Sequence, residues 1–114
     1  MLSLLVVSAH LVGDFVLQTG GMARRKFKSP LVRLKHVLTY SVPMALVAFY
    51  YWPADVAFYF VLSQALLHFL IDTQRWVKPK KNFEAYPIVV DQTLHLTSLA
   101  LLLVVVHEFF SVPV

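Results

Sequence analysis

Long apolar stretches alternate with polar segments along this chain. The apolar stretches cover residues 2–17, 37–52, 56–71 and 88–110. A helix needs about 17–25 mainly apolar residues to cross the hydrocarbon core of a membrane, and the flanking residues bring each stretch near that length. Ser29-Pro30 is typical of a helix N-cap followed by a first-turn proline, and Pro87 suits the first turn of the last helix. The pattern predicts helices at about residues 2–18, 30–52, 55–77 and 87–110.

The amino-acid composition indicates which class of protein these predicted helices form. Of the 114 residues, 59% are hydrophobic and 14% are charged, which is more apolar surface than one small soluble core can bury. We therefore expect an all-α polytopic membrane protein, with four transmembrane helices in an antiparallel bundle and residues 1–114 forming a single integral membrane domain. Cysteine is absent, which excludes disulfides and thiolate metal sites.

The basic residues predict the orientation of the bundle. All ten Lys and Arg residues fall in two segments, residues 24–35 and 75–81, which lie between the first and second helices and between the third and fourth. Because basic loops remain cytoplasmic, both segments are expected to face the cytoplasm and both termini to lie outside it. The predicted location is the inner (cytoplasmic) membrane, with several passes. This placement already explains the net charge of +4, so the lipid bilayer, not nucleic acid, is the expected partner.

Polar residues inside the predicted helices carry the candidate chemistry. Three helices each contain a His and an Asp four residues apart, which places both side chains on one helical face. In the fourth helix, which runs antiparallel to the other two, the order of His and Asp is reversed. The two types of side chain are therefore expected at matched depths near the cytoplasmic side. The pairs are His10 with Asp14, His68 with Asp72, and Asp91 with His95.

Buried carboxylates brought close together need a cation or a proton, and imidazole with carboxylate is a ligand set for zinc, iron or manganese. We therefore predict a divalent transition metal, with zinc first and Mn or Fe as alternatives. The predicted ligands are His10, Asp14, His68, Asp72, Asp91 and His95. The catalytic candidates, which would transfer the proton of a metal-activated water, are Asp14, Asp72, Asp91 and His36. Three glutamines, Gln18, Gln64 and Gln92, are expected to be hydrogen-bond partners of the site and not ligands.

These residues also carry a family resemblance. The segment from His10 to Gln18, the basic loop, His36, the segment from His68 to Asp72 and the segment from Asp91 to His95 resemble a family of small bacterial and phage-encoded membrane proteins. That family is described only as a domain of unknown function. The resemblance covers nearly the whole chain and implies four membrane helices with the His and Asp positions as their signature. It implies no activity.

The favoured function is that of a metal-dependent hydrolase that acts at the cytoplasmic leaflet on a lipid-like or amphiphilic substrate. Two alternatives stay open. One is a proton or metal-ion transport or relay protein, because His and Asp chains in membranes are typical parts of such pathways. The other is a non-catalytic assembly subunit in which the pairs only lock helix packing. Four short helices enclose little volume, so a homo-oligomer is expected.

Overall fold

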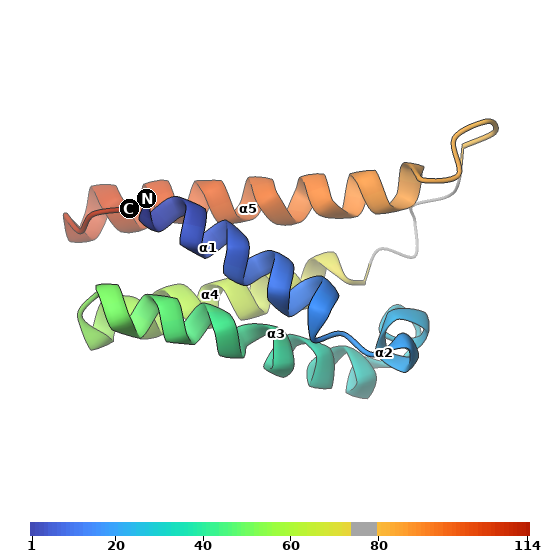
Figure 1. Cartoon of the computed structure of the whole chain (residues 1–114), viewed down its shortest axis with the longest axis horizontal. Coiled ribbons are helices and arrows are strands. Elements are labelled where there is room, and N and C mark those ends of the chain that lie inside the picture. The colour runs from blue at the N-terminus through green and yellow to red at the C-terminus, as the bar shows by residue number, and fades with distance from the viewer. Residues whose placement is uncertain (74–79) are drawn as a thin grey trace.

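The computed structural model describes residues 1–73 and 80–114 of the chain. The all-α prediction is confirmed, because the described residues are mostly helical and contain no β-strand. Four long helical segments lie side by side, and a short fifth helix crosses one end of them (Figure 1). In chain order the elements are α1 (Leu2–Leu11), the π-helical turn η1 (Val12–Val16), α2 (Gly20–Arg25), α3 (Pro30–Tyr51), α4 (Ala54–Ile71) and α5 (Tyr86–Phe110).

Local chemistry sets the helix ends. The Ser29 hydroxyl accepts a hydrogen bond from the Val32 amide at 3.3 Å, and Pro30 follows as the first helical residue, so α3 begins as the sequence predicts. The predicted third helix extended to residue 77, whereas α4 ends at Ile71. There the Thr73 hydroxyl donates to the Leu70 carbonyl at 2.6 Å, a local bond that competes with further helix. Residues 74–77 of that prediction lie outside the described residues.

The first predicted helix differs most from expectation. Its last turn is the π-helical η1, and the Thr19 hydroxyl then caps the separate helix α2, which the apolar pattern did not predict. Gly13 lies in η1 against α3. A Cβ added at Gly13 would stand 2.8 Å from both the backbone oxygen and a ring carbon of Tyr40. Only glycine permits this approach, which brings the neighbouring Asp14 close to α3.

The bundle has an apolar end and a polar end. Both termini lie at one end, while α2 and the turn before α5 lie at the other (Figure 1). Near the termini the core is apolar and includes Val6, Met44, Ala48, Trp52, Val56, Phe60, Leu102 and Val106. Toward α2 the buried residues become His, Asp, Gln and Lys. The polar cluster therefore sits off-centre, within about half of the bundle.

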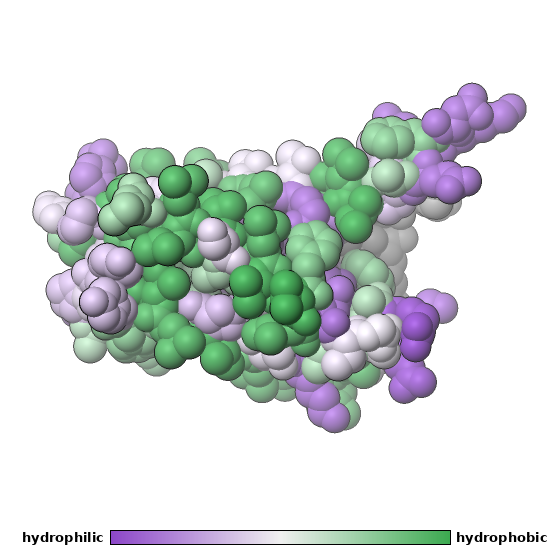
Figure 2. Space-filling model, viewed as in Figure 1, coloured by the Kyte–Doolittle hydropathy of each residue, from purple (hydrophilic) through white to green (hydrophobic). Residues whose placement is uncertain are grey.

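Among the described residues, two helices, α4 and α5, are long and apolar enough to cross a membrane by length and composition. The apolar segment Leu2–Val16 is shorter, and α3 carries Arg33, Lys35 and His36 in its first half and is not among these candidates. Only 28% of each apolar window is buried inside the protein. The face shown in Figure 2 is correspondingly apolar over most of its length, with the most hydrophilic residues gathered toward α2 and the turn before α5.

Candidate functional site

Polar side chains from four elements meet in one buried cluster. Asp14 comes from η1, His36 from α3, His68 and Asp72 from the end of α4, and Asp91 and His95 from the first turns of α5. None of these six residues is more than 7% exposed. The structure thus brings together five of the six predicted ligands. It adds His36, which the sequence assigned to proton transfer.

Three residues of this cluster, Asp14, His36 and His68, form a first group with metal-ligand spacing. The Nε2 atoms of His36 and His68 lie 3.0 Å apart. Asp14 Oδ1 lies 3.1 Å from the His36 nitrogen and 3.6 Å from that of His68. Asp72 Oδ2 lies 3.4 Å and 3.3 Å from the same two nitrogens. In a tetrahedral zinc site with bonds of about 2.0–2.1 Å, neighbouring ligand atoms stand about 3.3–3.5 Å apart. The separations among Asp14, His36 and His68 fit one transition-metal ion, whereas Asp72 belongs to a separate group with His68 and His95.

His95 extends the cluster toward α5. Its Nδ1 donates to the Asp91 backbone carbonyl at 2.8 Å, which leaves Nε2 with the lone pair. That Nε2 makes no hydrogen bond and lies 3.7 Å from Asp72 Oδ1. The Asp91 carboxylate is 3.5 Å from His95 Nδ1. His68, Asp72 and His95 form a second group with metal-ligand spacing, and Asp14, Asp91 and His95 form a third.

His10 lies one layer deeper and is not brought into any of these groups. Its Nδ1 lies 3.1 Å from the Tyr40 hydroxyl, and its Nε2 lies 3.2 Å from Gln92 Oε1. Because the amide oxygen can only accept, Nε2 carries the proton and Nδ1 accepts from Tyr40. Gln64 Nε2 donates to the Tyr40 oxygen, and Gln92 Nε2 donates to Asp14 Oδ2 at 2.7 Å. His10 therefore supports Asp14 through Gln92.

Gln92 thus bonds a carboxylate of the site as the sequence predicted, whereas Gln64 bonds the Tyr40 hydroxyl. Gln92 also donates to Asp91 Oδ2 at 2.9 Å, so one amide group holds carboxylates of two helices. Gln18 lines a cavity beside the site and makes no hydrogen bond through Oε1.

Lys26 is the site residue that sequence reasoning missed. Its ammonium lies 3.2 Å from Asp72 Oδ1, 3.6 Å from Asp14 Oδ1 and 3.5 Å from His36 Nε2, and the residue is only 5% exposed. Arg33 holds this segment in place, because its guanidinium donates to the backbone carbonyls of Lys26 and Phe27. In the sequence both residues belong to a basic segment whose charge is already explained by the predicted membrane orientation. No sequence signal therefore distinguished them from the other Lys and Arg residues of that segment.

The buried charges of this cluster are incompletely matched. Within the described part of the chain, the two carboxylates of Asp14 and Asp72 form ion pairs with a single ammonium, that of Lys26. Asp72 has no exposed surface, and neither of its carboxylate oxygens makes a hydrogen bond. A buried carboxylate without such bonds is costly unless a cation or proton compensates it. The donor set and its spacing favour a divalent cation.

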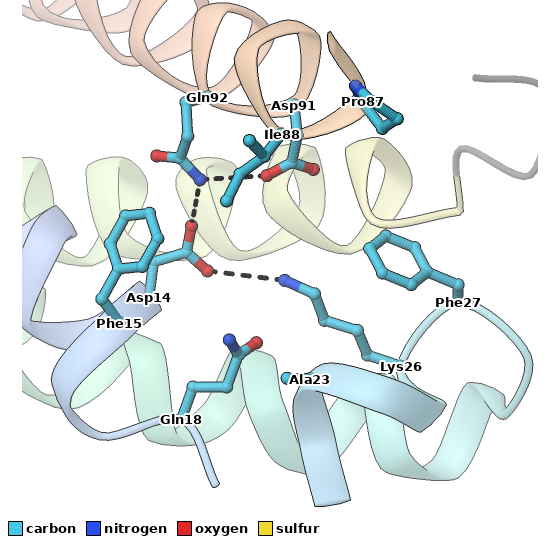
Figure 3. Close-up of a pocket in the computed structure, with 10 residues that line it drawn as sticks. All are labelled: Asp14, Phe15, Gln18, Ala23, Lys26, Phe27, Pro87, Ile88, Asp91 and Gln92. Carbon is cyan, nitrogen blue, oxygen red and sulfur yellow. Dashed lines mark hydrogen bonds and ion pairs between the residues drawn. The ribbon is translucent and has the colours of Figure 1, made fainter. Parts of the chain in front are cut away.

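A cavity of about 400 Å³ opens beside the cluster, between η1, α2 and the start of α5 (Figure 3). Asp14, Lys26 and Asp91 point into it, and Phe15, Phe27 and Ile88 form apolar walls. Phe15 and Ile88 are also about half exposed on the outer surface. The cavity therefore connects the charged cluster with the apolar flank of the bundle.

Comparison with known proteins agrees with the resemblance seen in the sequence. A family model described as "Protein of unknown function (DUF3307)" matches residues 1–113. The chain belongs to this family. The match shows the kinship of nearly the whole chain without assigning the family an activity. No curated protein and no solved structure matches the chain.

Proposed function

We propose that this DUF3307 member is an integral protein of the inner (cytoplasmic) membrane. Four segments would cross the membrane: α1 with η1, α3, α4 and α5. The protein's longest dimension of 45 Å fits a bilayer with its head-group regions, about 40–45 Å. The lipid-facing character of α4 and α5 supports this, since most of each apolar window is not buried inside the protein. The described basic residues lie toward the α2 end, away from the termini. That end then faces the cytoplasm and both termini face outward.

The buried cluster binds a divalent transition metal, with zinc the first candidate. The observation that carries this proposal is the convergence of Asp14 Oδ1, His36 Nε2 and His68 Nε2, whose separations are 3.0–3.6 Å, with Asp72 Oδ2 within 3.4 Å of both nitrogens. Two further groups could contribute ligands to the same ion or to a second one. They are His95 Nε2 and the Asp91 carboxylate. His36 is a ligand in this proposal, whereas the sequence suggested a proton shuttle.

The reaction that this site supports best is hydrolysis of an ester bond in an amphiphilic substrate. A bound metal lowers the pKa of its water, so that hydroxide forms near neutral pH. In such a hydrolysis the water oxygen would bond to the electrophilic centre as the ester bond breaks, and the departing oxygen would take up the proton that the water releases. Asp91 lines the cavity and is placed to carry this proton. The apolar walls of the cavity and its position at the cytoplasmic leaflet favour a substrate with a polar head and a lipid tail.

A transport or relay protein is less well supported. The described chain does hold a hydrogen-bonded series from Gln64 through Tyr40, His10 and Gln92 to Asp14. However, beyond this layer the core toward the termini consists of apolar side chains such as Met44, Phe60 and Leu99. A pathway for protons or ions would have to continue through that half of the bundle.

Metal content of the purified protein tests the proposal. Elemental mass spectrometry after purification without chelator, and after reconstitution with Zn²⁺ or Mn²⁺, should find about one or two ions per chain. His68→Ala and Asp72→Asn should lose them. His107→Ala is the matched control, because His107 is exposed near the opposite end of α5. Wild-type protein that binds no metal under any of these conditions would refute the metalloenzyme proposal.

A further inference from the structure

Lys26 occupies an unusual position for a residue of a basic loop. It follows α2 directly, yet its ammonium points into the bundle and lies within 3.6 Å of carboxylate oxygens on two other elements. Figure 3 shows the side chain crossing the floor of the cavity toward Asp14. The ammonium thus stands beside the converging ligand atoms and also lines the cavity.

A metal ion and this ammonium compete for the same two carboxylates. Metal binding at Asp14 and at Asp72 would deprive Lys26 of both partners and place further positive charge within a few ångströms of it. A buried ammonium without a counter-ion is strongly unfavourable. The flexible four-carbon stem of lysine lets the ammonium move, and the adjoining cavity is the nearest space for it.

On the basis of the proposed function, we propose that Lys26 binds the anionic head group of the substrate, with phosphate monoesters as the chemical class, once a metal ion has displaced it from Asp14 and Asp72. The cavity matches such a ligand in two respects. Its polar side offers the Lys26 ammonium and the Gln18 amide as donors. Its apolar side is lined by Phe15 and Ile88, which are also exposed on the outer surface. The carboxylates of the cavity would repel an anion until the metal neutralises them, so the metal binds first.

This order predicts reciprocal coupling between metal and head group. Because coupling is a shared free energy, the metal should tighten head-group binding by the same factor by which the head group tightens metal binding. The probes are Zn²⁺ and dodecyl phosphate, titrated calorimetrically into the full chain in a non-ionic maltoside detergent. In wild-type protein we expect each ligand to raise the affinity of the other at least about tenfold.

Lys26→Met tests the assignment to this residue. It should bind Zn²⁺ about tenfold more tightly than wild type, because no ammonium has to be displaced, and it should lose most of the coupling to dodecyl phosphate. Lys35→Met is the matched control, since Lys35 is exposed on α3 and should leave both affinities unchanged. Lys26→Arg keeps the charge and should retain coupling. Thermal unfolding of each variant shows that it is folded.

The possible outcomes separate this inference from the metal site itself. Coupling that persists unchanged in Lys26→Met would overturn the inference, as would a loss of Zn²⁺ affinity in that variant equal to that of Asp72→Asn. In either case wild-type metal binding would leave the proposed function standing. Wild-type protein without metal would overturn both. Inorganic phosphate in place of dodecyl phosphate identifies the source of the head group: equally tight binding would contradict an amphiphile and point to a free anion.

Discussion

The Nε2 atoms of His36 and His68 lie 3.0 Å apart, and neither ring has any exposed surface. Two imidazole nitrogens at that distance cannot both carry a proton, so at least one lone pair points into the space between α3 and α4. Carboxylates of Asp14 and Asp72 flank the same space. A buried position bordered by lone pairs and negative oxygens favours a cation, so metal binding is the first property to test.

Metal binding should stabilise the fold measurably. An ion that binds only the folded state at about 100 times its Kd adds about 2.7 kcal/mol of stability. We expect Zn²⁺ to raise the Tm of the detergent-solubilised wild type and a chelator to reverse the rise. In His36→Ala the shift should disappear, because one of the three converging ligands Asp14, His36 and His68 is lost. An unchanged shift in that variant would mean that the ion binds elsewhere.

Gly13 should be intolerant of even a methyl group. Gly13→Ala places a Cβ 2.8 Å from the Tyr40 carbonyl oxygen, and neither backbone can yield without moving η1 away from α3. Such overpacking costs typically about 1–3 kcal/mol, so the Tm should fall, and the displacement of Asp14 should weaken Zn²⁺ binding as well. Gly21→Ala is the control, since its nearest contact would be 3.8 Å away at Thr19 Oγ1. Equal Tm values for the two variants would contradict the close approach of η1 and α3.

How far the sequence predicts this structure depends on the kind of signal. The i, i+4 spacing places each His and Asp pair on one helical face. Together with the expected antiparallel order of the helices, it predicts that Asp14, Asp72, Asp91, His68 and His95 lie close together. The same reasoning predicted His10 as a ligand, yet its ring nitrogens are taken up by Tyr40 and Gln92. The spacing of residues along one helix does not predict which side chains of other helices form hydrogen bonds with them.

The features that sequence reasoning missed share one cause. Lys26 was hidden by a rule that explained every basic residue in its segment equally well. The π-turn η1 depends on contact between Gly13 and Tyr40, two residues far apart in the chain. At the end of α4, the Thr73 hydroxyl donates a hydrogen bond to the Leu70 carbonyl, and this bond competes with continuation of the helix. Each of these features depends on a specific contact, either between distant residues or within one turn, and the periodicity of the sequence does not predict such contacts.

Tyr40 should matter for stability but not for the number of metal ions bound. Tyr40→Phe keeps the ring that stacks on His68 at a centroid distance of 3.9 Å, and removes the hydroxyl that joins Gln64 to His10. Leaving those buried groups without a partner costs about 1–3 kcal/mol, which a lower Tm would report. Elemental analysis should still find wild-type metal content. Tyr50→Phe, at a residue 80% exposed, is the control and should change neither quantity.

The proposed orientation can be tested on a background without native thiols, because the chain has no cysteine. Single cysteines at Ser111, beyond α5, and at Glu84, in the turn before it, lie at opposite ends of this helix and are both exposed. In intact cells, a membrane-impermeant maleimide should label Ser111→Cys, whereas Glu84→Cys should react only after the membrane is permeabilised. Labelling of both in intact cells would show that α5 does not cross the membrane, and the reverse pattern would show an inverted orientation. An inverted orientation would also place the buried cluster near the outer leaflet, so the source of its substrate depends on this result.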